Sequence, residues 1–268
     1  LGVFMENRDN RNDNAYYTEY DNMSGTSYSN DGKFKYDDGG YTHSYNNAVD
    51  SADMESKIMT KSFMVVLIAL IVTAITATIV VANEAVAEAV FSAFMPLLFG
   101  ELIVVFAATA AIRKRNVVLA SVLFTIYAIV NGMTLSIVFF AYDLGSIQEV
   151  FLLTAGMFAG MAIIGATTHI DLTKMGSFLI MGIWGMILVT VVNLIFIHSS
   201  GLNLLMDYLG VLIFVGLTAY DTQKMRRMAR SSDAASANSI ALYCGMELYL
   251  DFINLFIRLL SIFGKNRK

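Results

Sequence analysis

Apolar residues are concentrated in seven continuous runs that fill the chain after about residue 60. Each run is roughly 20 residues long, the length that an α-helix needs to cross the hydrocarbon core of a bilayer. The strands of a membrane barrel alternate between apolar and polar side chains, whereas these runs are apolar throughout, so they predict helices. We expect membrane-spanning helices at residues 62–83, 90–112, 117–141, 148–167, 175–197, 203–222 and 239–263.

The overall composition agrees with a membrane protein. Of the 268 residues, 56% are hydrophobic and 15% are charged, whereas soluble domains carry about a quarter charged residues. In a bilayer, only helices and closed barrels satisfy all backbone hydrogen bonds. The expected fold class is therefore an all-α integral membrane protein with seven transmembrane helices.

Residues 1–57 differ from the rest because they have no hydrophobic period and are rich in Asn, Asp, Tyr, Ser and Gly. Such a segment cannot bury enough apolar surface to offset the entropy of ordering it. We expect a disordered polar tail in the cytosol, followed by a transmembrane domain over residues 58–268. Met5 is the expected initiator, with residues 1–4 foreign to the native chain. No cleaved leader is expected, because the first apolar run begins near Ser62.

The basic residues indicate an orientation in the membrane. They flank alternate ends of the runs, at Lys57 and Lys61, Arg113–Arg115, Lys174 and Lys224–Arg230. Loops rich in Lys and Arg stay in the cytosol, which places the N-terminus there. The basic C-terminal sequence GKNRK then lies outside if all seven runs cross the membrane. A re-entrant last segment is the alternative.

Three features within the runs are expected to serve packing. Gly156 and Gly160 form a GxxxG pair, a spacing that lets two helices approach closely. Pro96 is expected to kink the second span, because proline removes a backbone hydrogen bond. Trp184 lies in the middle of the fifth span and is expected in the core.

Four acidic residues fall within or at the edge of the predicted spans, namely Glu101, Asp221, Glu247 and Asp251. A charge near the bilayer centre costs at least about 2.5–3.5 kcal/mol, so such residues face a cavity or a partner. We expect a functional role for at least one of them, with a purely structural network as the alternative. Counting residues from the span ends places Asp221 and Asp251 at similar depths near the cytosolic boundary.

Two carboxyl groups in contact share a proton, because both cannot ionise cheaply. A protonated pair would tie the sixth span to the seventh, and an ionised pair would push them apart. Asp221 and Asp251 are therefore a candidate pH sensor and gate. Their oxygens are also suitable ligands for Ca²⁺, which makes the same two residues a candidate metal site.

Two further acids and two arginines complete the candidate site. Glu247 precedes Asp251 by one helical turn and is expected either to line the cytosolic mouth or to be a surface charge near the lipid headgroups. Glu101 is near the centre of the second span, where a carboxylate could line a cation pathway. Arg113 and Arg115 are candidate charge partners of the aspartates, although the positive-inside rule alone accounts for this basic string.

Other classes of chemistry lack their residues. One cysteine and three separated histidines exclude an internal disulfide and classical zinc sites. Asp221 lies in a Tyr-Asp string, but no GxGD sequence surrounds Asp251, as an intramembrane aspartyl protease would require. The last span has no lysine before Lys265 for a Schiff base. We expect neither enzyme activity nor catalytic residues, no cofactor other than Ca²⁺ as the transported ion, and no nucleic-acid partner.

Two strings near the C-terminus carry a family resemblance. GLTAYDTQKM, from Gly216 to Met225, is followed about 25 residues later by LYLDFINLFIRLL. The pair resembles the Bax inhibitor-1 family, also called the transmembrane BAX inhibitor motif proteins. The resemblance covers the chain from about residue 58 to residue 268. Glu101 and the basic end of the second span also fit.

The resemblance implies a fold in which the last of seven helices is surrounded by the other six. It also implies a pH-sensitive calcium leak controlled by Asp221 and Asp251, with the family's arginine at Arg113 or Arg115. Bacterial relatives lie in the inner membrane, where some are linked to a membrane protease, and we expect the same location here. The alternative function is a regulator without channel activity that binds other membrane proteins, such as a protease or a death-pathway component.

Overall fold

The computed structural model describes residues 26–28, 34–36 and 39–267, with side chains from residue 52 onward. The chain divides into two units, Leu1–Asp53 and Met54–Lys268. In the first unit, β1 (Thr26–Tyr28) and β2 (Phe34–Tyr36) pair antiparallel. Most of the predicted disordered tail lies outside the described residues.

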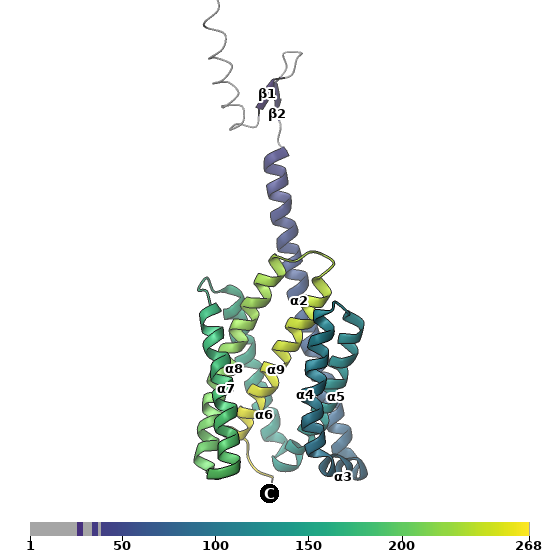
Figure 1. The fold of residues 1–268 in the computed structure, drawn as a ribbon, viewed down its shortest axis with the longest axis vertical. Helices are drawn as coiled ribbons and strands as arrows, with labels where there is room; N and C mark the ends of the chain where they lie inside the picture. Colours follow the sequence, from purple (N-terminus) through teal and green to yellow (C-terminus); the bar gives the residue numbers. More distant parts are fainter. Residues whose placement is uncertain (1–25, 29–33, 37–38, 268) are drawn as a thin grey trace, which may run out of the picture. The chain divides into compact units, whose positions relative to one another are not determined.

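Helices make up the second unit, and the first of them begins within the first unit (Figure 1). In chain order they are α2 (Gly39–Ala82), α3 (Glu84–Ser92), α4 (Phe94–Arg113), α5 (Val117–Ala141), α6 (Leu144–Thr167), α7 (Thr173–Val192), the short π-helix η1 (Asn193–Ile197), α8 (Ser200–Arg230) and α9 (Ala237–Phe263). Within the described part of the chain, seven helical segments are long and apolar enough to cross a membrane. The predicted all-α class with seven membrane helices is confirmed at this level.

Two helix boundaries differ from those predicted. The second span begins at Phe94 and is preceded by the separate short helix α3, so Pro96 lies in the first turn of α4. The first turn tolerates proline because its N–H groups have no partner within the helix. The predicted span 90–112 is therefore interrupted, but at Ala93, three residues before Pro96, rather than by a kink inside a continuous helix. The second difference is in α8, which continues to Arg230, eight residues beyond the predicted end of the sixth span.

The last helix is the most buried of the seven. In its most apolar 18-residue window, 67% of the residues are buried, against 11–39% in the other six. The Tyr249 hydroxyl bonds to Thr73 of α2 and Asn131 of α5, while the Phe252 ring packs 5.4 Å from that of Phe158 on α6. Helix α9 also packs along α8. Its position makes α9 the element against which several others are held.

Helix α7 lies at the edge of the bundle, where it packs against α8. Only 11% of its most apolar window is buried. Trp184 of this helix is 69% exposed, so its predicted place in the core is wrong. In a membrane protein such a surface faces lipid tails, which are as apolar as the core itself.

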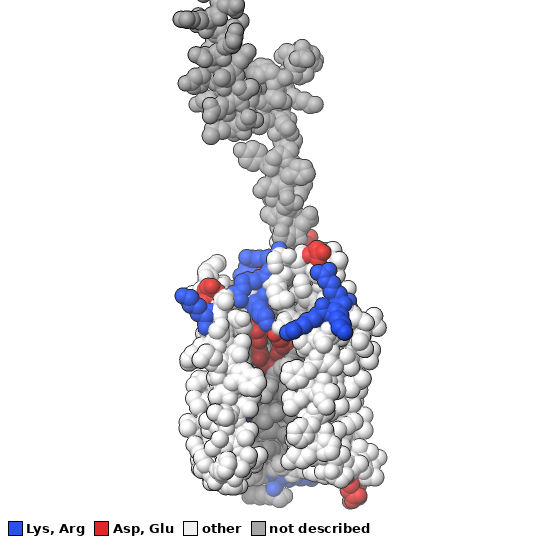
Figure 2. Space-filling model, viewed as in Figure 1, with Lys and Arg blue, Asp and Glu red and all other residues white. Residues whose placement is uncertain are grey.

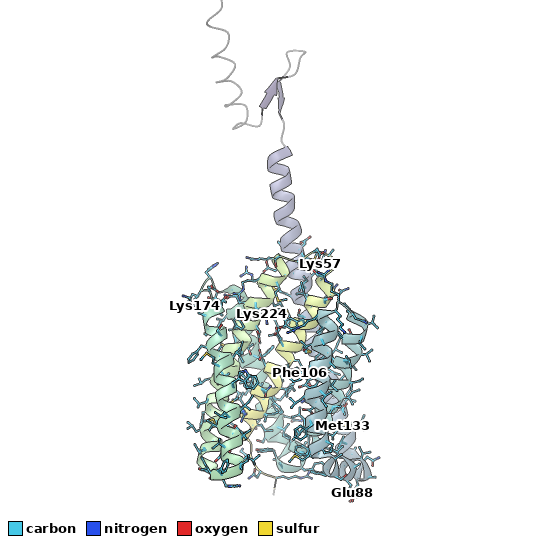
Figure 3. The ribbon with its side chains drawn as sticks, viewed as in Figure 1. Lys57, Glu88, Phe106, Met133, Lys174 and Lys224 are labelled. Carbon is cyan, nitrogen blue, oxygen red and sulfur yellow. The ribbon has the colours of Figure 1, made fainter. Side chains whose placement is uncertain are left out.

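The two ends of the bundle differ in charge (Figure 2). Lys and Arg side chains gather where α4 and α8 end and where α5 and α9 begin, which we call the basic end. Lys57, Lys174 and Lys224 lie toward this end, and Glu88 lies at the opposite end (Figure 3).

The C-terminus lies at the end opposite the basic end (Figure 1). Helix α9 has 27 residues, or about 40 Å at the rise of an α-helix, which is enough to cross a bilayer. Beyond it, the Lys265 carbonyl accepts a hydrogen bond from the Asp143 N–H, and Asn266 pairs with Tyr142. These contacts tie the C-terminal segment to the α5–α6 connection, and they agree with a last segment that crosses rather than re-enters.

Close helix contacts occur at glycines other than the predicted pair. A Cβ atom added at Gly156 or Gly160 would meet nothing within 4 Å, so the GxxxG prediction is wrong for these residues. At Gly165 of α6, by contrast, an added Cβ would lie 2.2 Å from the carbonyl oxygen of Ala219 on α8. Because this neighbour is backbone, it cannot move aside as a flexible side chain would.

Gly165→Ala is therefore expected to lower the free energy of unfolding relative to Gly160→Ala by about 1–3 kcal/mol, the usual cost of overpacking. Both substitutions lie in α6 and gain similar helix propensity, so the difference between them isolates the contact with α8. Thermal unfolding of the two purified variants in one detergent measures it. Equal unfolding temperatures would contradict the close approach of α6 and α8.

Candidate functional site

Three acidic side chains gather between α8 and α9 in the half of the bundle nearer the basic end. Asp221 comes from α8, and Glu247 and Asp251 come from α9; we call them the acidic cluster. The carboxyl groups of Asp221 and Asp251 lie within hydrogen-bonding range of each other. Figure 2 shows acidic side chains in a hollow between the helices, just below the gathered basic side chains. The contact between Asp221 and Asp251 agrees with the similar depths that the sequence predicts for them.

Asp251 is the most confined member of the acidic cluster. It is only 4% exposed, and its Oδ2 atom has no hydrogen-bond partner among the described residues. A buried carboxylate without donors is costly to ionise. A proton shared with Asp221 supplies the missing donor, and it also removes one of two adjacent negative charges. The local geometry therefore favours one proton on the pair.

Lys224 contributes a cation to the acidic cluster. Its Nζ atom lies 2.7 and 2.9 Å from the two carboxylate oxygens of Glu247 and 4.0 Å from Oδ1 of Asp221. It also donates a 3.2 Å hydrogen bond to the Tyr243 hydroxyl. The ammonium group thus occupies a position where a mobile cation would meet these acids.

The pairing of Lys224 with the acidic cluster was not predicted from the sequence. There, this residue served only as one of the basic residues that indicate the orientation in the membrane. A signal was available, because Lys224 follows Asp221 by three residues and such residues share one face of a helix. Its contacts also settle the position of Glu247, which is paired inside the structure rather than free on the helix surface. Among the described residues, no three His, Cys, Asp or Glu side chains form a group that could hold a metal ion.

Glu101 belongs to a second polar cluster. Its Oε1 atom accepts a 2.5 Å hydrogen bond from the hydroxyl of Thr134, and its carboxyl group lies within hydrogen-bonding range of Asn131. The Asn131 Oδ1 atom in turn accepts a 3.0 Å hydrogen bond from the Tyr249 hydroxyl, which lies 2.7 Å from the Thr73 hydroxyl. The cluster joins α2, α4, α5 and α9.

The two clusters lie on different faces of α9. Tyr249 and Asp251 are two residues apart, which is about 200° around a helix and about 3 Å along it. Tyr249 accordingly points to α2 and α5, while Asp251 points to α8. The structure therefore does not bring Glu101 together with the two aspartates, although all three lie on α9 or on helices packed against it.

Arg113 and Arg115 lie at the end of α4 and just beyond it. Both are exposed and line a cavity that Lys224 also lines. Within the described part of the chain, neither arginine forms an ion pair with Asp221 or Asp251. The two arginines share a cavity with Lys224, which contacts the acidic cluster, but they do not contact the aspartates themselves.

A buried ion pair in the other half of the bundle was also missed. The Nη1 atom of Arg258 on α9 donates a 2.8 Å hydrogen bond to Oδ1 of Asp207 on α8. Ser261 donates to the second oxygen of Asp207, which is 7% exposed. Asp207 lies seven residues after the start of α8, and Arg258 lies five before the end of α9. At a rise of 1.5 Å per residue, Asp207 and Arg258 lie about 10 and 8 Å from these helix ends. A count of residues from the ends of the two helices would therefore have predicted that they lie at similar depths.

Comparison with known proteins gives consistent matches along most of the chain. The family model described as inhibitor of apoptosis-promoting Bax1 matches residues 55–268. An uncharacterized protein of Borreliella burgdorferi is 42% identical over 219 residues, which cover 80% of this chain and 94% of that protein. The inner membrane protein YbhL of Escherichia coli K12 is 38% identical over 206 residues, which cover 75% of this chain and 88% of YbhL.

Arg258→Met is expected to destabilise the protein by about 3–5 kcal/mol, because it leaves the buried carboxylate of Asp207 without its cation. The double variant Asp207→Asn with Arg258→Met removes both charges and should recover part of that loss. Denaturant unfolding in a fixed detergent compares both of them, and the single variant Asp207→Asn, with the native chain. If the double variant were as unstable as the sum of the two single variants, the ion pair would not couple α8 to α9.

Proposed function

Since the chain belongs to the Bax inhibitor-1 family, we propose that this multi-pass membrane protein is a calcium leak channel whose opening depends on pH through Asp221 and Asp251. The observation that carries the proposal is the contact between these two carboxyl groups, because the buried Oδ2 atom of Asp251 has no hydrogen-bond partner among the described residues. The contact joins α8 to α9 in the half of the bundle nearer the basic end.

In the proposed closed state, one shared proton holds α8 and α9 together. Loss of that proton leaves two negative charges side by side. Two unit charges about 4 Å apart repel by about 4 kcal/mol at an effective dielectric constant of about 20. Repulsion of this size is enough to shift a two-state equilibrium by roughly a thousandfold. Opening is therefore expected to increase as the pH rises.

The same change in charge prepares the path for calcium. Two ionised aspartates offer oxygen ligands to Ca²⁺, with water completing its coordination. Glu247 stands at the entrance together with Lys224, whose ammonium group must leave before a divalent cation can bind there. Glu101 and its hydrogen-bonded neighbours offer a second polar station on the other side of α9.

The proposal includes an arrangement and a location for the protein. We propose that α9 is the central helix, which the other six surround, so that separation from α8 opens a path along its length. Applying the positive-inside rule to the basic end places that end and the N-terminus in the cytosol. YbhL of Escherichia coli is named an inner membrane protein, and we assign this chain to the inner membrane of a bacterium by analogy.

Calcium entry into dye-loaded liposomes that carry the purified protein tests the function. Between about pH 6 and pH 8, where buried carboxyl pairs that share a proton change their charge, flux through the native protein should rise. Asp251→Asn cannot ionise at that position, so it should abolish or flatten this dependence. Glu88→Gln removes an exposed acid at the opposite end and should behave like the native chain.

Two results would contradict parts of this proposal. Flux no greater than that of empty liposomes at every pH would favour a regulator that binds another membrane protein, with the acidic cluster serving only to hold the fold. A pH-dependent flux that Asp251→Asn leaves unchanged would keep the leak but remove the aspartates from the gate.

Lys224→Gln tests whether the built-in ammonium group competes with the transported ion. A partly exposed ion pair contributes up to about 1 kcal/mol, so its removal should lower the Ca²⁺ concentration for half-maximal flux by roughly two- to fivefold. Lys224→Arg keeps the charge and serves as the control. The measurement is the calcium dependence of flux at the alkaline end of the range, and identical curves for all three proteins would show that Lys224 does not occupy the ion path.

A further inference from the structure

A cavity with charged and hydroxyl side chains in its wall opens at the basic end, above the acidic cluster. It has a volume of about 710 Å³ and lies among the end of α4, the last part of α8 and the connection from α8 to α9. Its charged lining residues are Arg113, Arg115, Lys224 and Asp233. Serine hydroxyl groups also line it, from Ser231, Ser232, Ser236 and Ser239.

The charge inside this cavity is positive. Three cations face a single acid, Asp233, which accepts hydrogen bonds from the hydroxyl group and the backbone N–H of Ser236. These bonds hold the pKa of Asp233 below its usual value, so it stays ionised at neutral pH and offsets only one positive charge. Lys224 is paired with Glu247, whereas Arg113 and Arg115 form no ion pair with any described residue.

Hydrogen-bond donors accompany the arginines. Ser239 lines the cavity, is only 7% exposed, and makes no side-chain hydrogen bond to a described residue. The residue that precedes α9, Ser236, gives the helix no side-chain cap, so the first backbone N–H groups of this 27-residue helix remain available at the cavity wall. Helix N-termini of this kind favour negatively charged oxygens.

We propose that this cavity binds a phosphate group, carried by an anionic phospholipid of the adjacent leaflet. Arginine forks pair with phosphate oxygens through two parallel hydrogen bonds, and the Ser239 hydroxyl group and the α9 N-terminus supply further donors. The site needs no calcium transport and is independent of the function proposed above.

The surface of α4 favours a lipid over a soluble phosphate compound. Phe106 precedes Arg113 by seven residues, or almost two full turns, so both side chains lie on nearly the same face of the helix. Phe106 is 72% exposed and Ile103 is 69% exposed, and Phe106 lies toward the middle of the bundle's length (Figure 3). A phospholipid with its phosphate at Arg113 can therefore lay its acyl chains along an apolar strip that leads to the bilayer centre.

Native mass spectrometry of the full chain in neutral detergent, titrated with phosphatidylglycerol, tests the proposal. The variant Arg113→Gln with Arg115→Gln loses two charge-assisted contacts and should bind the lipid about tenfold more weakly or worse. Lys174→Gln removes one cation of the basic end that does not line the cavity and should bind it like the native protein. Ser239→Val provides an independent variant that keeps every charge and should also weaken binding.

The outcomes separate the possible ligands. Saturable binding of phosphatidylglycerol that the arginine and serine variants lose, with no binding of inorganic phosphate, is the expected result. If inorganic phosphate competed with the lipid at the site that these substitutions remove, the site would still bind phosphate, but its ligand would be a soluble compound rather than a lipid. The proposal would be overturned if Lys174→Gln lost binding equally. It would also be overturned if binding stayed native in Arg113→Gln with Arg115→Gln and in Ser239→Val. In either case, attraction of the lipid to the basic end would be nonspecific.

Discussion

A buried carboxyl group on the most enclosed helix is the constraint on which the rest of the site depends. Asp251 is almost fully removed from solvent, and the carboxyl group of Asp221 is its close neighbour. Two such groups cannot both be charged without a large electrostatic cost. Their protonation state therefore contributes to the free energy of packing α8 against α9. Lys224 and Glu247, one turn nearer the basic end, add a second charged contact between the same helices.

Helix α9 collects the polar contacts of the bundle at successive levels. Glu247 and Asp251 face α8 in one half, Tyr249 faces α2 and α5, and Arg258 faces Asp207 of α8 in the other half. Apolar side chains slide past one another at little cost in lipid, because the bilayer interior is as apolar as they are. Hydrogen bonds and ion pairs fix the register of the helices instead. A helix that carries them at three levels can hold its neighbours in one arrangement.

The sequence predicted depth far better than direction. Run length identified the seven spans, and the constant rise of a helix placed Asp221 and Asp251 at compatible depths. It did not predict that Glu101 points to a separate cluster, that Trp184 faces outward, or that Gly165 rather than Gly156 makes the close contact. In a soluble helix, the apolar stripe shows which face is inside. Here the inner and outer faces are both apolar, so the pattern around the helix carries little information about which face points inward. Only the polar residues indicate that face.

Infrared difference spectroscopy of the protein in lipid tests the central claim most directly, because the C=O stretching band of a protonated carboxyl group is distinct from that of a carboxylate. The account predicts that the native protein shows such a band near neutral pH, that it disappears as the pH rises, and that Asp251→Asn and Asp221→Asn each remove or shift it. A spectrum without a protonated carboxyl band near neutral pH, or one that neither variant alters, would contradict the shared proton between α8 and α9.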